Sequence, residues 1–112
     1  MVNYDFRSAQ QLASDIRSAH MAIDSALADL ATLASSVIAT CRTSDAAPAQ
    51  TQAVIEGVAA GLNKMVDARK GFIQAHREIA IAQRHSNLKE VGFGCLGPDT
   101  FFQAAGLRVV TG

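Results

Sequence analysis

The chain repeats one short pattern around two of its three histidines. His20 and His76 each follow an alanine and precede an isoleucine by three residues. Asp24 lies four residues after His20, which is about one helical turn, so the two side chains would share a helix face. Imidazole nitrogens and carboxylate oxygens are common ligands of zinc and iron. His20, Asp24 and His76 are therefore the candidate metal ligands of this chain.

The metal hypothesis competes with a structural one. Diiron bundles use Glu-x-x-His pairs with several further inward carboxylates. Here Glu78 follows His76 by two residues, which points it to another helix face. Histidines at the edge of a packed helix commonly hydrogen-bond to neighbouring groups or to water. We favour this structural role and expect no cofactor, with a small metal-binding four-helix bundle as the alternative.

The other reactive residues form no recognisable catalytic arrangement. The sequence contains no GxSxG, GxxxxGK[ST], HExxH or GxGxxG motif. Cys41 and Cys95 lack CxxC spacing and are expected to be free thiols. Lys70, Arg77 and Arg84 lie seven residues apart, and acidic residues elsewhere in the chain are available to offset this solvated face. The sequence therefore predicts a protein that is not an enzyme.

Charge and hydropathy narrow the classes of partner. Ten Lys and Arg balance ten Asp and Glu in 112 residues, so the positive field that gathers nucleic acids is missing. The first ten residues lack the basic and apolar regions of a signal peptide. No run approaches the roughly 18 uninterrupted apolar residues of a membrane span. We expect a cytoplasmic protein that neither binds nucleic acid nor spans a membrane.

The distribution of glycine and proline divides the chain into elements. Residues 5–42 contain neither residue and are rich in alanine and leucine, which predicts one long helix. The segment TSDAAPAQTQ then supplies turn residues, and Pro48 suits a first helical turn because it lacks an N–H group. A second helix is expected over about 48–85. The sequence thus predicts an all-α fold, with a long antiparallel helical hairpin over residues 1–88.

Apolar residues recur every seven positions in both predicted helices. The expected interface rows are Ile16, Ile23, Leu30 and Val37 in the first helix and Val58, Met65, Phe72 and Ile79 in the second. Leu12, Ala19, Ala26 and Leu33 form the expected companion row of the first helix. Paired antiparallel, the two interface rows place the turn between Ala47 and Pro48, and they place the two repeated histidines at one level.

A single hairpin buries only one apolar stripe against another, which rarely stabilises a domain. A second hairpin would cover the remaining apolar surface. We therefore expect a homodimeric four-helix bundle, or docking of the hairpin against a different helical partner. The chain would then be a non-enzymatic interaction or assembly protein that acts as an adaptor, a chaperone-like protein or a structural subunit.

The composition changes sharply in the tail, residues 89–112, where five of the eight glycines lie. Pro98 and Gly106 bracket a predicted short helix over about 98–105. Phe101, Phe102 and Leu107 then form an apolar cluster that either caps the hairpin or docks on a protein partner.

Overall fold

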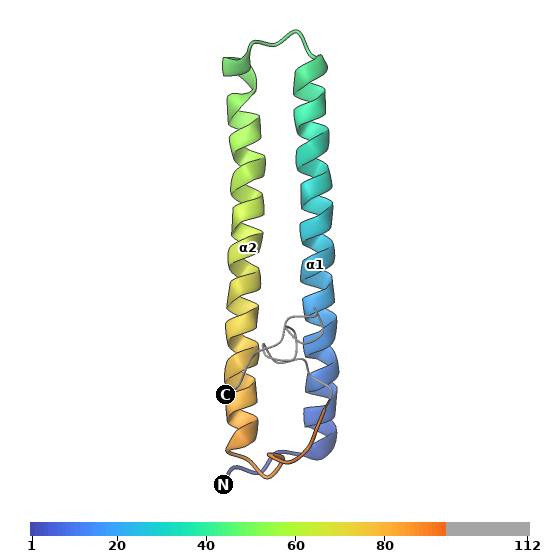
Figure 1. The fold of residues 1–112 in the computed structure, drawn as a ribbon, viewed down its shortest axis with the longest axis vertical. Coiled ribbons are helices and arrows are strands. Elements are labelled where there is room, and N and C mark those ends of the chain that lie inside the picture. Colours follow the sequence, from blue (N-terminus) through green and yellow to red (C-terminus); the bar gives the residue numbers. More distant parts are fainter. Residues whose placement is uncertain (94–112) are drawn as a thin grey trace, which may run out of the picture. The chain divides into compact units, whose positions relative to one another are not determined.

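Two long helices make up most of the described part of the chain. The computed structural model describes residues 1–93, in which α1 spans Phe6–Thr43 and α2 spans Pro48–Arg84. The helices run in opposite directions, and no strand occurs within residues 1–93 (Figure 1). The prediction of an all-helical hairpin is confirmed. The predicted helix over 98–105 and the cluster of Phe101, Phe102 and Leu107 lie outside the described residues.

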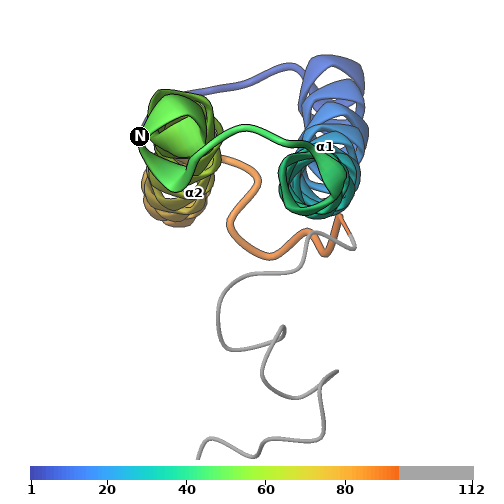
Figure 2. The same ribbon diagram turned by 90° about the horizontal axis from the view of Figure 1, so that it is seen from above.

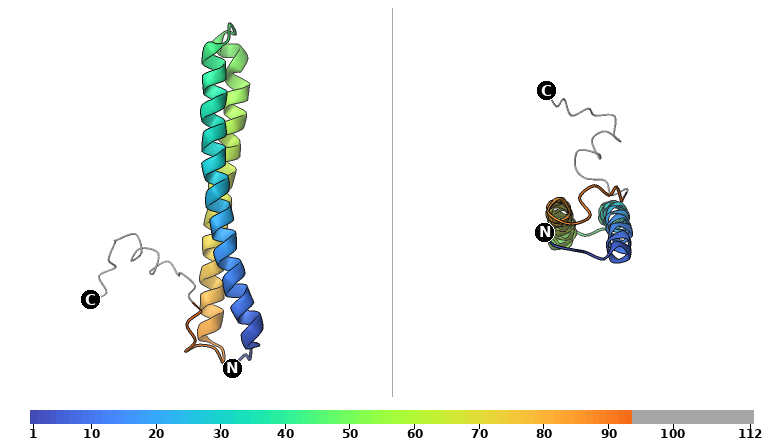
Figure 3. Two further views of the ribbon diagram at one scale, coloured as in Figure 1. Left: turned by 90° about the vertical axis from the view of Figure 1, so that its right-hand side faces the viewer. Right: turned by 90° about the horizontal axis from the view of Figure 1, so that it is seen from below.

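The chain divides into two compact units, and both helices cross the division. The end unit combines Met1–His20 with Gly71–Gly112, and the turn unit is Met21–Lys70. In each unit a segment of α1 lies beside an antiparallel segment of α2 (Figures 1 and 3). The two units are described separately below.

In the end unit, α1 begins at a side-chain cap. The Asp5 carboxylate accepts hydrogen bonds from the Ser8 backbone N–H at 2.9 Å and from the Ser8 hydroxyl at 3.0 Å. This is the N-cap geometry that satisfies amides left free in a first helical turn. The same bonds lower the pKa of Asp5 below its ordinary value, the backbone bond from Ser8 having the largest effect. The acidic residue at the predicted helix start therefore acts as the cap.

In the turn unit, residues 44–47 connect the two helices (Figure 2). The Ser44 hydroxyl donates to the Cys41 carbonyl at 2.8 Å, which satisfies one of the last carbonyls of α1. Ala47 precedes α2, and its N–H donates to Gln50 Oε1 at 2.7 Å. A glutamine that reaches back to the residue before its helix is half of a capping box. With Pro48 as the first helical residue, these bonds set where α2 begins.

After α2 the chain folds back within the end unit. Gln83 Nε2 donates to the carbonyl oxygens of Leu88 at 2.9 Å and Val91 at 2.7 Å. Ser86 is fully buried, and its hydroxyl donates to the Gln83 carbonyl at 2.7 Å. The ring centroids of Phe93 and Phe6 are 5.7 Å apart. These contacts bury Leu88 and hold residues 85–93 against the end of the hairpin.

Asn87 clamps the N-terminal segment to this fold-back. Its side-chain oxygen accepts from the Tyr4 N–H at 2.7 Å, and its amide nitrogen donates to the Tyr4 carbonyl at 3.0 Å. Its backbone N–H also donates to the Val2 carbonyl at 3.1 Å. Residues that are far apart in sequence thus close the end unit with a pair of reciprocal bonds.

Asn87→Ala should weaken the end unit, because the substitution removes both side-chain bonds to Tyr4. Each such bond contributes about 0.5–1.5 kcal/mol, so we expect a loss of about 1–2 kcal/mol in the free energy of unfolding. Urea denaturation followed by circular dichroism measures the loss. Asn63→Ala is the matched control, since Asn63 is an exposed asparagine within α2. Equal stability of the two variants would contradict a role for the clamp.

The packed face of α1 follows an alternating spacing of three and four residues. Its least exposed positions include two heptad rows, Ala9, Ile16, Ile23, Leu30 and Val37, and Ala13, His20, Leu27, Ala34 and Cys41. All of these residues are half-buried except Ala13, which is buried. Alternating spacings of three and four are typical of a helix that packs along one neighbour. The interface row predicted for the first helix therefore lies on the packed face.

The companion row predicted for α1 is wrong at two of its four positions. Leu12 and Leu33 are 44% and 50% exposed, whereas Ala13 and Ala34 lie on the packed face. Both sets are within one turn of the interface row, because 3.6 residues per turn bring i−3 and i−4 to opposite flanks of residue i. The small alanines, and not the larger leucines, occupy the side that faces α2.

The interface row predicted for α2 has reduced exposure at three of its four positions. Val58, Met65 and Ile79 are half-buried, whereas Phe72 is 48% exposed and its neighbour Ile73 is half-buried. A second row of reduced exposure runs beside it, formed by Ile55, Leu62, Arg69, His76 and Gln83. The packed face of α2 thus carries polar residues that hydropathy alone did not identify.

Candidate functional site

The two repeated histidines meet across the end unit. His20 on α1 and His76 on α2 place Nε2 and Nδ1 at 3.3 Å, and their ring centroids are 5.4 Å apart with the planes tilted by 43°. At this distance one ring donates its N–H to the unprotonated nitrogen of the other. His76 is buried, at 7% exposure, and His20 is half-buried. The histidines form a hydrogen-bonded pair on the packed face.

The surroundings of His76 oppose its protonation. The pKa of His76 is lowered from its ordinary value of 6.5, first because burial disfavours the charged ring and second because His20 lies beside it. Arg17 on α1 directs Nη1 to the Phe93 carbonyl at 2.9 Å, and Arg77 on α2 directs Nη1 to Gln74 at 3.3 Å. Neither arginine is bonded to the imidazoles. The neutral form of His76 is therefore favoured, which allows a single N–H between the two rings.

The third candidate metal ligand is engaged elsewhere. Asp24 belongs to the turn unit, where its Oδ1 accepts from Arg69 Nε at 2.8 Å. Within residues 1–93 no group of three or more His, Cys, Asp or Glu side chains is arranged to hold a metal ion. The structure brings His20 and His76 together and gives Asp24 a different partner. The geometry of the three residues is that of two separate structural contacts.

Three polar residues on the packed face of α2 share one property. Arg69, His76 and Gln83 follow Ile55 and Leu62 at intervals of seven, and each has a polar partner in its own unit. Sequence reasoning identified His76 but not the other two, because it followed apolar residues. Extending the heptad from Ile55 and Leu62 would have found all three.

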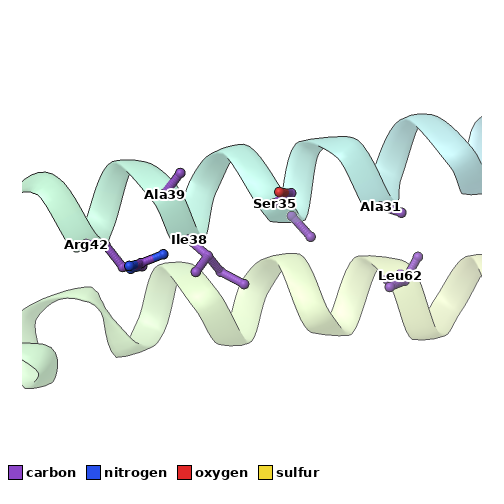
Figure 4. Close-up of a pocket in the computed structure, with 7 residues that line it drawn as sticks. Ala31, Ser35, Ile38, Ala39, Arg42 and Leu62 are labelled. Carbon is purple, nitrogen blue, oxygen red and sulfur yellow. The ribbon is translucent and has the colours of Figure 1, made fainter.

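The turn unit carries a shallow apolar groove of about 450 Å³ beside the helices (Figure 4). Its lining residues are Ala31, Ala34, Ser35, Ile38, Ala39 and Arg42 of α1 and Leu62 of α2. Figure 4 shows Ile38 and Arg42 directed toward the space between the helices and Leu62 directed toward α1. Ile38 remains 47% exposed. Apart from Ser35 and Arg42, the side chains that line the groove are apolar.

Other exposed apolar side chains lie along both helices. They include Met21, Leu33, Val54, Val66 and Phe72, which are between 48% and 64% exposed. Cys41 is a half-buried free thiol, and Cys95 lies outside the described residues. The described surface therefore carries many apolar side chains that are available for contact.

Among the described residues, α1 is the only helix that is long and apolar enough to cross a membrane. Core helices of soluble proteins and signal sequences also have this length and composition. The helix carries the exposed carboxylates Asp24 and Asp29 within its middle turns. A charge of this kind near the centre of a bilayer is costly.

Comparisons with protein-family models, with curated proteins and with solved structures find no match for this chain.

Proposed function

We propose that this chain is a non-enzymatic helical interaction protein that self-associates and serves as an adaptor, a chaperone-like protein or a structural subunit of an assembly. The observation that carries the proposal is the small interior of the hairpin. Within residues 1–93, Ala13 and Leu88 are the only buried hydrophobic residues, while many larger apolar side chains are exposed. Apolar surface left by one hairpin is most simply covered by another.

The proposed form is a homodimer in which two hairpins make a four-helix bundle in the cytoplasm. Four helices enclose an interior, whereas two helices share only one line of contact. Equal numbers of acidic and basic residues leave no net charge to keep two copies apart. The tail cluster of Phe101, Phe102 and Leu107 would add either a cap on the bundle or a contact with a further protein.

Sedimentation equilibrium without detergent tests self-association. We expect a dimer at micromolar concentration, with the fraction of dimer falling on dilution as mass action requires. A monomer that persists over a tenfold range above that concentration would contradict the proposal. A requirement for detergent to keep the chain in solution would instead favour α1 as a membrane-inserted helix.

A further inference from the structure

The groove in the turn unit lies on a face of α1 that ends in opposite charges. Asp24, Ala31 and Ile38 lie seven residues apart, and Ser35 and Arg42 form the adjacent row of the same face. Asp24 and Arg42 are 18 residues apart, which corresponds to about 27 Å along a helix. The face therefore has a carboxylate at one end, a guanidinium at the other, and alanines and a serine between them.

The two charges differ in how far the hairpin satisfies them. Asp24 accepts one bond from Arg69, and its side chain remains 58% exposed. Arg42 is exposed, and its guanidinium makes no hydrogen bond or ion pair within residues 1–93. The face thus has an unpaired cation and a carboxylate that can still accept.

We propose that a second copy of this chain docks in the groove, with its α1 antiparallel to the first α1 about a two-fold axis. In this arrangement Arg42 of each copy meets Asp24 of the other. The same symmetry brings Ala31 of one copy opposite Ser35 of the other, close to the axis. This inference rests on the proposed self-association and names the surface that performs it.

Self-complementarity favours a second copy over an unrelated partner. An isologous contact needs one patch that matches itself when turned by two-fold rotation. The face of α1 meets this requirement because Asp24 and Arg42 carry opposite charges. In the sequence, Leu33 lies midway between them. The alanines and serine permit close approach of two helices, so that the ridges of one enter the groove of the other. The half-exposed Ile38 would become buried in the contact.

Val66 extends the apolar surface on α2. It follows Leu62 by one helical turn on the same face and is 51% exposed. Since Leu62 lines the groove, a helix docked there would contact both helices of the hairpin. Contact with two helices gives the apolar interior that a four-helix bundle requires.

Ser35→Glu tests the docking surface, and Ser36→Glu is the matched control. Both serines are exposed and adjacent in α1, but only Ser35 lines the groove. A carboxylate at Ser35 would be buried between the copies, so we expect the dissociation constant of the dimer to rise at least about tenfold. Ser36→Glu should dimerise as the parent does. Sedimentation equilibrium gives the constants, and circular dichroism checks that both variants keep their helix content.

The outcomes separate this inference from the proposal on which it rests. A dimer that both variants leave intact would overturn docking in the groove but preserve self-association. A parent chain that is monomeric would overturn both. If a different partner occupies the groove, both variants would again dimerise as the parent chain does, and this result counts against the inference.

Disulfide trapping covers the case in which Ser35→Glu fails to fold. Two chains, one with Ala31→Cys and one with Ser35→Cys, are mixed in a background of Cys41→Ala and Cys95→Ser. The antiparallel arrangement predicts that the mixture forms crosslinked heterodimers on mild oxidation, because the two substituted positions face each other. Replacing Ser35→Cys by Ser36→Cys should abolish the crosslink. Equal crosslinking in both mixtures would contradict the proposed arrangement.

Discussion

Leu30→Asp should unfold much of the chain, whereas Leu33→Asp should leave it folded. Leu30 lies on the packed face of α1, and Leu33 is 50% exposed on the other flank of the same helix turn. An aspartate at Leu30 would lose apolar contacts and bring an unpaired carboxylate against α2. We expect this to cost about 2–4 kcal/mol, which is a large share of the stability of a small domain.

Thermal and urea denaturation followed by circular dichroism measure this difference directly. Leu33→Asp makes the same chemical change in the same helix, so helix propensity and net charge are matched between the two variants. Its expected cost is within about 1 kcal/mol, because exposed substitutions away from special features have small effects. Comparable losses in both variants would show that the packed face of α1 is not the one described.

Acidification should destabilise the end unit through His76, which is hydrogen-bonded to His20. The pKa of His76 is lowered in the folded state from its ordinary value of 6.5. As the pH falls through about 6.5, the unfolded chain therefore binds protons that the folded chain does not. The stability present above this pH is lost progressively as the pH falls toward the folded pKa. Protonation of the ring nitrogen that accepts the hydrogen bond would also break that bond, because both facing nitrogens would then be donors.

Melting temperatures measured between about pH 7.5 and about pH 5 test this expectation. His76→Gln should flatten the pH dependence, because glutamine does not titrate. His85→Gln is the control, since His85 is an exposed histidine outside the pair. An acid response that is unchanged in His76→Gln would show that other groups cause it.

Much of the fold could be predicted because its local signals agree. A long run without glycine or proline favours α1, and the turn segment with Pro48 determines where α2 begins. The antiparallel arrangement of the rows also brought His20 and His76 to one level, and the structure places their nitrogens at 3.3 Å. These features depend on spacing, which a sequence displays directly.

The incorrect predictions concern positions where the size or polarity of a side chain does not match its burial. Leu12 and Leu33 are more apolar than Ala13 and Ala34, so hydropathy favoured them for the packed companion row. Packing between two close helices instead favours small side chains at that flank. Arg69 was missed for a related reason, since hydropathy does not extend the row of Ile55 and Leu62 to a charged position. The structure places Arg69 there, bonded to Asp24 across the hairpin.

The fold-back over residues 85–93 was beyond prediction for a different reason. Its contacts join residues that are distant in sequence, such as Tyr4 with Asn87 and Arg17 with Phe93. Hydrophobic periodicity carries no information on such pairs. The metal hypothesis had the same weakness, because sequence spacing placed Asp24 near His20 but could not show that Arg69 binds it.

The polar residues on the packed face bear on which alignment of the helices the chain adopts. The apolar residues repeat so regularly that sliding one helix past the other by seven positions would cover nearly the same hydrocarbon surface. The energies of such alternatives would differ little if burial alone decided them. Sliding would separate His76 from His20 in one unit and Arg69 from Asp24 in the other, which would leave the buried His76 without its partner and break the ion pair. Beyond any contribution to overall stability, these contacts make one alignment lower in energy than its near-equivalents.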